Sequence, residues 1–166
     1  MPEGDTIHAA ASRIRAVLLD RVPDGVDMPQ RRHANDRWPS RLAGRAVRSV
    51  DAHGKHLFVR FEDDLTLHSH LRMTGSWGVY RKGARWRRAA RRAWIVIAVG
   101  EWQVVEFDGP VLELMKESRT RFDRRLAALG PDVIGAGFDL PGVVERLRAQ
   151  DPARTIGDAL LDQRVI

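Results

Sequence analysis

The first residues of the chain, Met1-Pro2-Glu3, place a possible nucleophile beside a possible acid. Removal of Met1 would leave Pro2 with a free secondary amine. A terminal amine has a pKa of about 8, below that of lysine, and it can form an iminium at an aldehyde carbon such as C1′ of a deoxyribose. Glu3 could move the proton, and Lys55 could donate to a leaving group. Taken one at a time, these residues are more often an ordinary second-position proline and two solvated surface charges.

A helix is needed to hold this terminus still. Apolar residues at helical spacing predict one over residues 7–18, and Asp5 and Thr6 stand just ahead of it as N-cap residues. The positive end of that helix dipole would lie beside the terminus.

The middle of the chain alternates short apolar runs with turn signals. The alternation predicts seven strands, at 45–51, 55–62, 65–70, 75–80, 93–99, 102–107 and 111–115, after an irregular loop over 22–40. Their short connections favour antiparallel pairing in a β-sandwich. Helices are predicted at 117–129, 140–150 and 155–166. The fold class is therefore α+β, with an N-terminal helix on a two-layer antiparallel sandwich (1–116) followed by a helical part (117–166).

Composition narrows the class of protein. The 166 residues include 28 Lys+Arg and 22 Asp+Glu, a formal charge of +6 that suits an anionic partner such as nucleic acid. There is no cysteine, which excludes disulfides and thiolate metal sites. Because no apolar run approaches the roughly 20 residues of a membrane span, we expect a cytoplasmic protein with no membrane partner.

Two further clusters permit more than one interpretation. The segment 81–92 (RKGARWRRAARR) carries seven basic residues and no acid. It could follow phosphates or stack Trp86 on a base, or it could be a solvated or disordered hairpin. His68 and His70 share one face of a predicted strand, which favours a structural or phosphate-binding role over a metal site because no third ligand is evident.

Five blocks of sequence occur in the order typical of one family. They are MPEGDT (1–6), HGKH (53–56), LTLHSHLRMTGS (65–76), LGPDV (129–133) and LLDQ (160–163). On these blocks the chain resembles the formamidopyrimidine-DNA glycosylase and endonuclease VIII family, most closely the endonuclease VIII side and its actinobacterial members. The resemblance implies a bifunctional glycosylase and AP lyase that flips an oxidised base out of double-stranded DNA, removes it and nicks the strand by β,δ-elimination.

The resemblance also implies roles for individual residues. Pro2 would be the Schiff-base nucleophile, Glu3 the acid that opens the deoxyribose, and Lys55 the lysine that assists base release. His70 would contact a phosphate. Met73 would be the apolar wedge that fills the space left by the flipped base, in a DNA-contacting loop with Leu71 and Arg72. The family further implies a monomer bound near the bacterial nucleoid.

At several positions the sequence differs from the family pattern, and these differences change the expected proton relay and substrate. Thr6 stands where an acid is common, so Asp5 is the alternative proton relay. The segment 108–113 (DGPVLE) lacks the arginine and aromatic residues that read the base opposite 8-oxoguanine, which favours oxidised pyrimidines. The wedge-loop trio Leu71-Arg72-Met73 differs from that of enteric endonuclease VIII.

The largest departure concerns the C-terminal side. The family continues through the rest of a helix-two-turn-helix domain and a four-cysteine zinc finger, so we expect this chain to be the N-terminal portion, with weakened DNA binding. It would carry no cofactor, the one structural zinc belonging to the full-length protein. A non-catalytic nucleic-acid-binding module with the same fold is the alternative.

Overall fold

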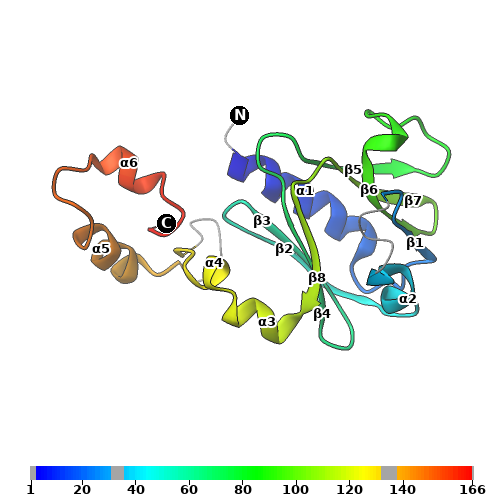
Figure 1. Ribbon diagram of the computed structural model, residues 1–166, viewed down its shortest axis with the longest axis horizontal. Coiled ribbons are helices and arrows are strands. Elements are labelled where there is room, and N and C mark those ends of the chain that lie inside the picture. The colour runs from blue at the N-terminus through cyan, green and yellow to red at the C-terminus, as the bar shows by residue number, and fades with distance from the viewer. Residues whose placement is uncertain (1–2, 31–35, 132–137, 166) are drawn as a thin grey trace. The chain divides into compact units, whose positions relative to one another are not determined.

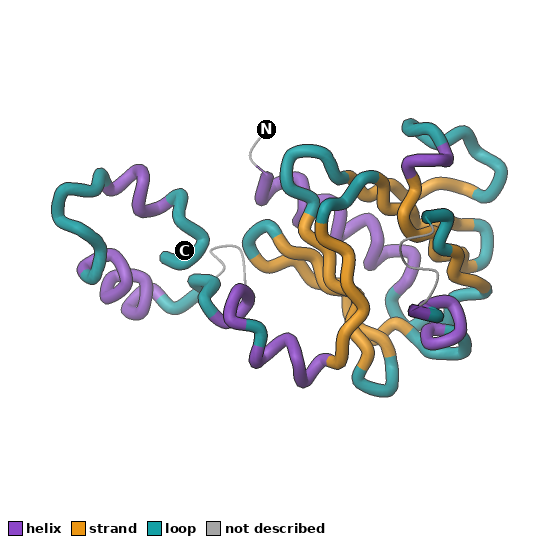
Figure 2. Tube along the Cα trace, viewed as in Figure 1, coloured by secondary structure: helices purple, strands orange, loops and turns teal. Residues whose placement is uncertain are grey.

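The computed structural model describes residues 3–30, 36–131 and 138–165. By their internal contacts these residues form two compact units, 1–117 and 118–166. The first unit holds the strands and the N-terminal helix, and the second holds short helices (Figures 1 and 2). We describe each unit by itself.

Two four-stranded antiparallel sheets build the first unit. Sheet A has the order β2-β3-β4-β8 and sheet B the order β1-β6-β7-β5. The strands of sheet A are β2 Val47–His53, β3 His56–Phe61, β4 Leu65–His70 and β8 Val111–Lys116. Those of sheet B are β1 Gly25–Asp27, β5 Ser76–Arg81, β6 Ala93–Val99 and β7 Trp102–Phe107. The seven predicted strands and their antiparallel pairing are confirmed.

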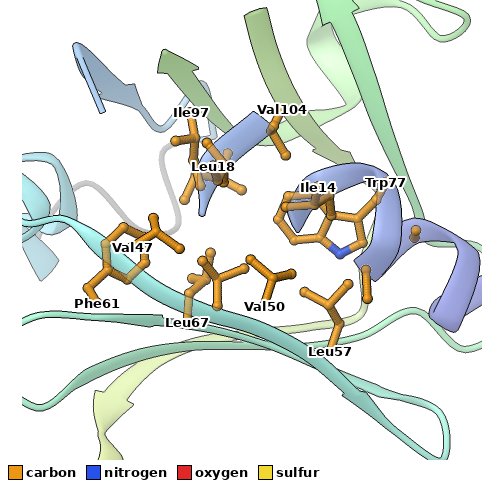
Figure 3. Close-up of a cluster of buried hydrophobic side chains, with 14 of the residues drawn as sticks. Ile14, Leu18, Val47, Val50, Leu57, Phe61, Leu67, Trp77, Ile97 and Val104 are labelled. Atoms are coloured by element: carbon orange, nitrogen blue, oxygen red, sulfur yellow. The ribbon is translucent and has the colours of Figure 1, made fainter. Parts of the chain in front are cut away.

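The helix α1 (Glu3–Leu18) completes the core of this unit. Its side chains Ile14 and Leu18 are fully buried, and Figure 3 shows them between side chains of the two sheets, Leu67 on one side and Ile97 on the other. Burial of each such aliphatic side chain contributes about 1.5–3 kcal/mol, so α1 is held along its length. The helix begins at Glu3, earlier than the predicted residue 7.

The segment predicted as an irregular loop over 22–40 contains two short elements that the sequence did not reveal. They are the strand β1 and the helix α2 (Trp38–Leu42). The side chains of Trp38 and Leu42 are buried in the core, and Pro39 stands in the first turn of α2, where a missing N–H costs nothing. Elements of three and five residues are too short to produce a periodic pattern, and packing alone stabilises them.

The second unit contains α3 Glu117–Phe122, α4 Arg124–Ala127, α5 Leu140–Arg148 and α6 Ile156–Leu160. The single helix predicted over 117–129 is wrong, because the chain breaks at Asp123 between α3 and α4. The prediction of a helix to residue 166 is also wrong, since α6 ends at Leu160. Beyond that end the Asp162 carboxylate accepts from Arg154 and Arg164 at 3.1 and 2.9 Å, side-chain bonds that compete with a further helical turn.

None of the helices within the described residues has the length and apolar character needed to cross a lipid bilayer.

Candidate active site

The strand register brings several loops of the first unit to one end of the sandwich. His53 pairs with His56, His56 with His70, and His70 with Val111. The turn between β2 and β3, the loop after β4 and the loop before β8 therefore begin or end at the same level of sheet A. Phe107 pairs with Ser76 in sheet B, which adds the start of β5 to this end.

The first turn of α1 is directed toward the same end. Leu19, just after the helix, forms a parallel bridge with Val47 at the start of β2, and the Arg15 side chain donates to the carbonyl of Val50. The helix therefore runs antiparallel to β2, and its beginning lies toward the strand's end at His53 (Figure 1). Pro2 lies outside the described residues, and Glu3 is described by its backbone alone, as the first residue of α1.

Lys55 occupies the two-residue turn between β2 and β3. Gly54 precedes it with φ +55°, a left-handed conformation that a two-residue hairpin turn requires and that glycine adopts without strain. Lys55 is half-buried in this turn. The structure thus brings Lys55 and His70 to the same end of the sheet.

The loop over residues 71–75, which we call the wedge loop, is anchored at its base and open at its tip. Leu71 is buried in the core, whereas the Met73 side chain is 94% exposed. Arg72 has φ +47° and donates its backbone N–H to Nδ1 of His70 at 3.2 Å. The N–H of Gly75 donates to the Leu71 carbonyl at 2.9 Å and closes the turn.

The three predicted DNA-contacting residues of the wedge loop differ in their exposure to solvent. Arg72 and Met73 are exposed, and Leu71 packs beneath them as the anchor of the loop. The exposure of Met73 agrees with the wedge role that the resemblance implies, and that role stays a prediction.

Asp108 ties the wedge loop to the loop before β8 and to the basic segment. Its carboxylate binds Arg88 and Arg92, each at 2.7 Å, and its carbonyl accepts from the Thr74 hydroxyl at 3.2 Å. Partial burial by itself raises the pKa of Asp108, but the hydrogen bonds from Arg92 and Arg88 outweigh it and lower that pKa. The carboxylate is therefore ionised at neutral pH and clamps three segments together.

The outer face of sheet A carries a chain of imidazoles beside the site. Nδ1 of His56 lies 2.8 Å from Nε2 of His68, and Glu113 lies 3.5 Å from Nδ1 of His68. The rings of His56 and His70 meet edge to face with 4.5 Å between centroids. The pair His68 and His70 was visible in the sequence, whereas His56 and Glu113 were missed. The strand register alone supplies them.

A buried carboxyl lies beneath the site, inside the sandwich. Glu106 is fully buried on β7 and accepts from the Ser69 hydroxyl at 2.5 Å, and that hydroxyl accepts from the indole N–H of Trp77 at 3.2 Å. Burial raises the pKa of Glu106 to about 8, against the opposing effect of the Ser69 hydrogen bond. A side chain at Gly109 would collide with this carboxyl, its Cβ falling 2.1 Å from Oε1. Nothing in the alternation of β7 distinguished this position in the sequence.

The zinc implied by the family resemblance does not fit the residues present. The family's site requires cysteine ligands, and this chain has none. Within the part of the chain that the structure describes, no group of three or more His, Cys, Asp or Glu side chains could hold a metal ion.

Comparison with known proteins decides the family. Residues 1–125 match the profile of the formamidopyrimidine-DNA glycosylase N-terminal domain. The chain belongs to this family. The resemblance predicted from the five sequence blocks is confirmed.

Curated relatives of this chain include proteins of Streptomyces and Mycolicibacterium. The chain is 40% identical to "Probable endonuclease 8 2" of Streptomyces coelicolor, over 99% of its own length and 57% of the relative's. It is 35% identical to "DNA-(apurinic or apyrimidinic site) lyase Nei2" of Mycolicibacterium smegmatis, over 100% of its length and 61% of the relative's. The chain thus spans about three fifths of the length of these relatives.

Solved structures share the fold of this chain. Lactococcus lactis Fpg bound to DNA with an abasic site superposes with a TM-score of 0.74 at 20% identity, over 100% of this chain and 61% of that one. The same protein with DNA containing N7-benzyl-Fapy-dG gives 0.73 at 19% identity, over 96% and 60%. The predicted α+β fold, an N-terminal helix on two antiparallel sheets, is confirmed.

Proposed function

We propose that this chain is the catalytic N-terminal portion of a bifunctional DNA glycosylase and AP lyase of base excision repair. The observation that supports the proposal most strongly is the convergence at one end of the sandwich of the first turn of α1, the Lys55 turn and the wedge loop. The names of the curated relatives, an endonuclease 8 and an AP-site lyase, agree with this activity.

The chemistry starts at the terminal amine. With Met1 removed, the nitrogen of Pro2 attacks C1′ of the damaged nucleotide, and the N-glycosidic bond breaks as the base leaves and takes up a proton. Glu3 protonates O4′, so the deoxyribose ring opens to an iminium on Pro2. Loss of a C2′ proton then breaks the 3′ C–O bond, and a further proton loss breaks the 5′ C–O bond. Water releases Pro2, and both strand ends carry phosphate.

The other site residues position the substrate in this proposal. Lys55 donates a hydrogen bond to the leaving base, and His70 contacts a phosphate next to the lesion. Met73 enters the duplex where the base has left and limits the unstacking cost of flipping, which is a few kcal/mol. Arg72 follows the backbone beside it, while Leu71 anchors the loop from the core. The partner is damaged double-stranded DNA bound by a single copy of the chain.

The loop before β8 supports a preference for oxidised pyrimidines. It contains no arginine or aromatic residue to read an opposite base, and Asp108 is engaged with Arg88 and Arg92. This loop therefore has no side chain that could recognise the base paired with 8-oxoguanine.

The activity is tested with end-labelled duplexes that each contain one lesion. We expect nicking of duplexes that carry 5-hydroxyuracil or an abasic site, with phosphate at both ends of the gap, and much slower nicking of duplexes that carry 8-oxoguanine. Lys55→Leu should slow base release while it leaves nicking at a preformed abasic site less affected. Absence of nicking at an abasic site would remove the proposal.

One observation favours the alternative of a non-catalytic DNA-binding module: the segment over residues 82–92 is rich in arginine. The intact mass of the native protein separates the two. If Met1 is retained, the nitrogen of Pro2 is an amide and has no lone pair for attack, so binding becomes the function.

A further inference from the structure

The segment between β5 and β6 folds into a fixed lobe, defined here as residues 82–92. Its Trp86 packs against Phe107 with ring centroids 5.7 Å apart and lies 6.3 Å from Tyr80, next to the buried cluster on the outer face of sheet B. The N–H of Arg87 donates to the Tyr80 hydroxyl at 3.4 Å. Trp86 therefore secures the lobe to the sheet instead of offering a platform for a base, and the lobe is neither a loose hairpin nor a stacking surface.

A groove of about 500 Å³ lies between this lobe and α1, along the edge strand β5. Gly78 forms part of its wall, where a Cβ would collide with the Tyr80 ring at 2.4 Å, so the absent side chain leaves room for Tyr80. Four arginines line the groove, and the described residues of its lining include no acid; they are Arg13, Arg85, Arg87 and Arg88.

Two of the four charges of this groove are available to a ligand. Arg85 and Arg87 are exposed and, within the described residues, form no ion pair. Arg81 and Lys82, by contrast, pair with Glu101 and Asp24 at 3.2 and 3.3 Å. The lobe thus neutralises the cations at its base, and Arg88 pairs with Asp108, whereas Arg85 and Arg87 are left without an acidic partner among the described residues. This arrangement costs self-repulsion unless an anion binds.

The groove is continuous with the wedge loop. Arg88 donates to the carbonyl of Thr74 at 2.8 Å, and β5 begins at Ser76, directly after that loop. A strand of DNA that passes Met73 would meet the groove next. Repeating phosphates at a spacing of several ångströms suit a row of arginines better than a single small anion does.

We infer that the groove formed by Arg13, Arg85, Arg87 and Arg88 binds the phosphodiester backbone of the DNA that flanks the lesion. The inference rests on the proposed function, because it assigns to that activity a second, sequence-independent contact. It accounts for the position of an arginine-rich lobe that is bonded to the wedge loop through Arg88. It also gives this portion of the protein a phosphate contact of its own.

The salt dependence of DNA binding tests the inference. The affinity of the full chain for a fluorescent duplex of about 20 base pairs with a central tetrahydrofuran is measured between about 25 and 200 mM NaCl. The variant R85Q/R87Q is compared with R21Q/R41Q. The control removes two exposed arginines at the other end, where Arg21 bonds Val47 and Arg41 belongs to α2.

Each phosphate contact contributes about 0.9 to the slope of log K against log salt. We expect R85Q/R87Q to reduce the slope by about 2 and the control to reduce it by less than about 0.5. Equal slopes in the two variants, an unchanged slope in R85Q/R87Q, or no DNA binding by the wild-type chain would overturn the inference.

Borohydride trapping on abasic DNA, done with the same proteins, separates this result from the proposed function. If R85Q/R87Q reduces the slope but no Pro2 adduct forms, the groove inference is supported and the catalytic proposal is rejected. If a Pro2 adduct forms but the two variants have equal slopes, the catalytic proposal is supported and the groove inference is rejected.

Discussion

His56 and His68 share a hydrogen bond of 2.8 Å between Nδ1 and Nε2, and their rings stack with 5.1 Å between centroids. One ring must donate and the other accept, so each fixes the tautomer of its partner. The ring of His56 also packs edge to face against that of His70. The His56–His68 pair therefore supports His70, which we propose to contact a phosphate.

Replacement of either histidine by leucine should be costly. His56→Leu or His68→Leu leaves a buried ring nitrogen of the other residue without this bond, which costs about 1–3 kcal/mol in the free energy of unfolding. The double variant removes both groups and should cost less than the sum of the single variants by about 1 kcal/mol. Urea unfolding of the three variants and the wild type gives the coupling. Strictly additive losses would show that the bond contributes nothing.

Because the pKa of Glu106 is raised in the fold, we expect the free energy of unfolding to fall as the pH rises. Its pKa is 4.5 in an unfolded chain and about 8 in the fold, so the unfolded state releases the proton first. The contribution of the protonated carboxyl is complete below pH 4.5 and is lost as the pH rises through about 8.

The matched variant for this effect is Glu106→Gln, which keeps the shape and a hydrogen bond to Ser69 without a titrating proton. Urea unfolding at pH 6, 7, 8 and 9 should give a shallower pH dependence for the variant and a crossover in its favour at the alkaline end. Parallel curves for the two proteins would contradict the assignment.

Gly75→Ala should disturb the wedge loop. A Cβ at this position falls 2.7 Å from the backbone oxygen of Leu71, and backbone cannot move aside as a flexible side chain can. We expect a loss of about 1–3 kcal/mol in unfolding free energy and weaker binding to lesion-containing DNA. Gly25→Ala is the control, since nothing lies within 4 Å of its Cβ. Equal behaviour of the two variants would mean that Gly75 has no role in the turn.

Asp108→Asn should loosen the contact between the wedge loop and the lobe. Asparagine tolerates the φ of +49° at this position but cannot form ion pairs with Arg88 and Arg92. Because the folded pKa of Asp108 is lowered, its contribution is present above the unfolded value of 3.8 and is lost as the pH falls through the folded value. At pH 7 we expect a loss of about 1 kcal/mol and faster amide exchange in residues 71–75. Unchanged exchange in that loop would argue against the clamp.

Much of this architecture is predictable from the sequence for physical reasons. Period-two alternation identifies strands that bury one face, which is why all seven long strands were found. The wedge-loop residues and Lys55 are predicted as site residues because they lie in blocks of recognisable order, and the strand register places them at one end of the sandwich. The start of the helix was placed late because residues 3–6 carry no apolar side chain that reports its first turn.

Other features depend on contacts between distant residues and left no local signal. The bond between His56 and His68 exists because two strands pair in one register, and Glu106 is buried because Ser69 faces it from the other sheet. The break at Asp123 is another such case, since the surrounding residues favour helix. The lobe could be predicted as basic, but only packing of Trp86 reveals that it is fixed.

The central claim, that Pro2 is the nucleophile, is tested most directly by covalent trapping. Protein whose intact mass shows that Met1 is absent is incubated with abasic-site duplex and sodium borohydride, digested, and mapped by mass spectrometry. Reduction of the iminium should leave a stable adduct on the nitrogen of Pro2, and none on Lys55. An adduct on Lys55 alone, or no adduct on protein that begins at Pro2, would contradict the account.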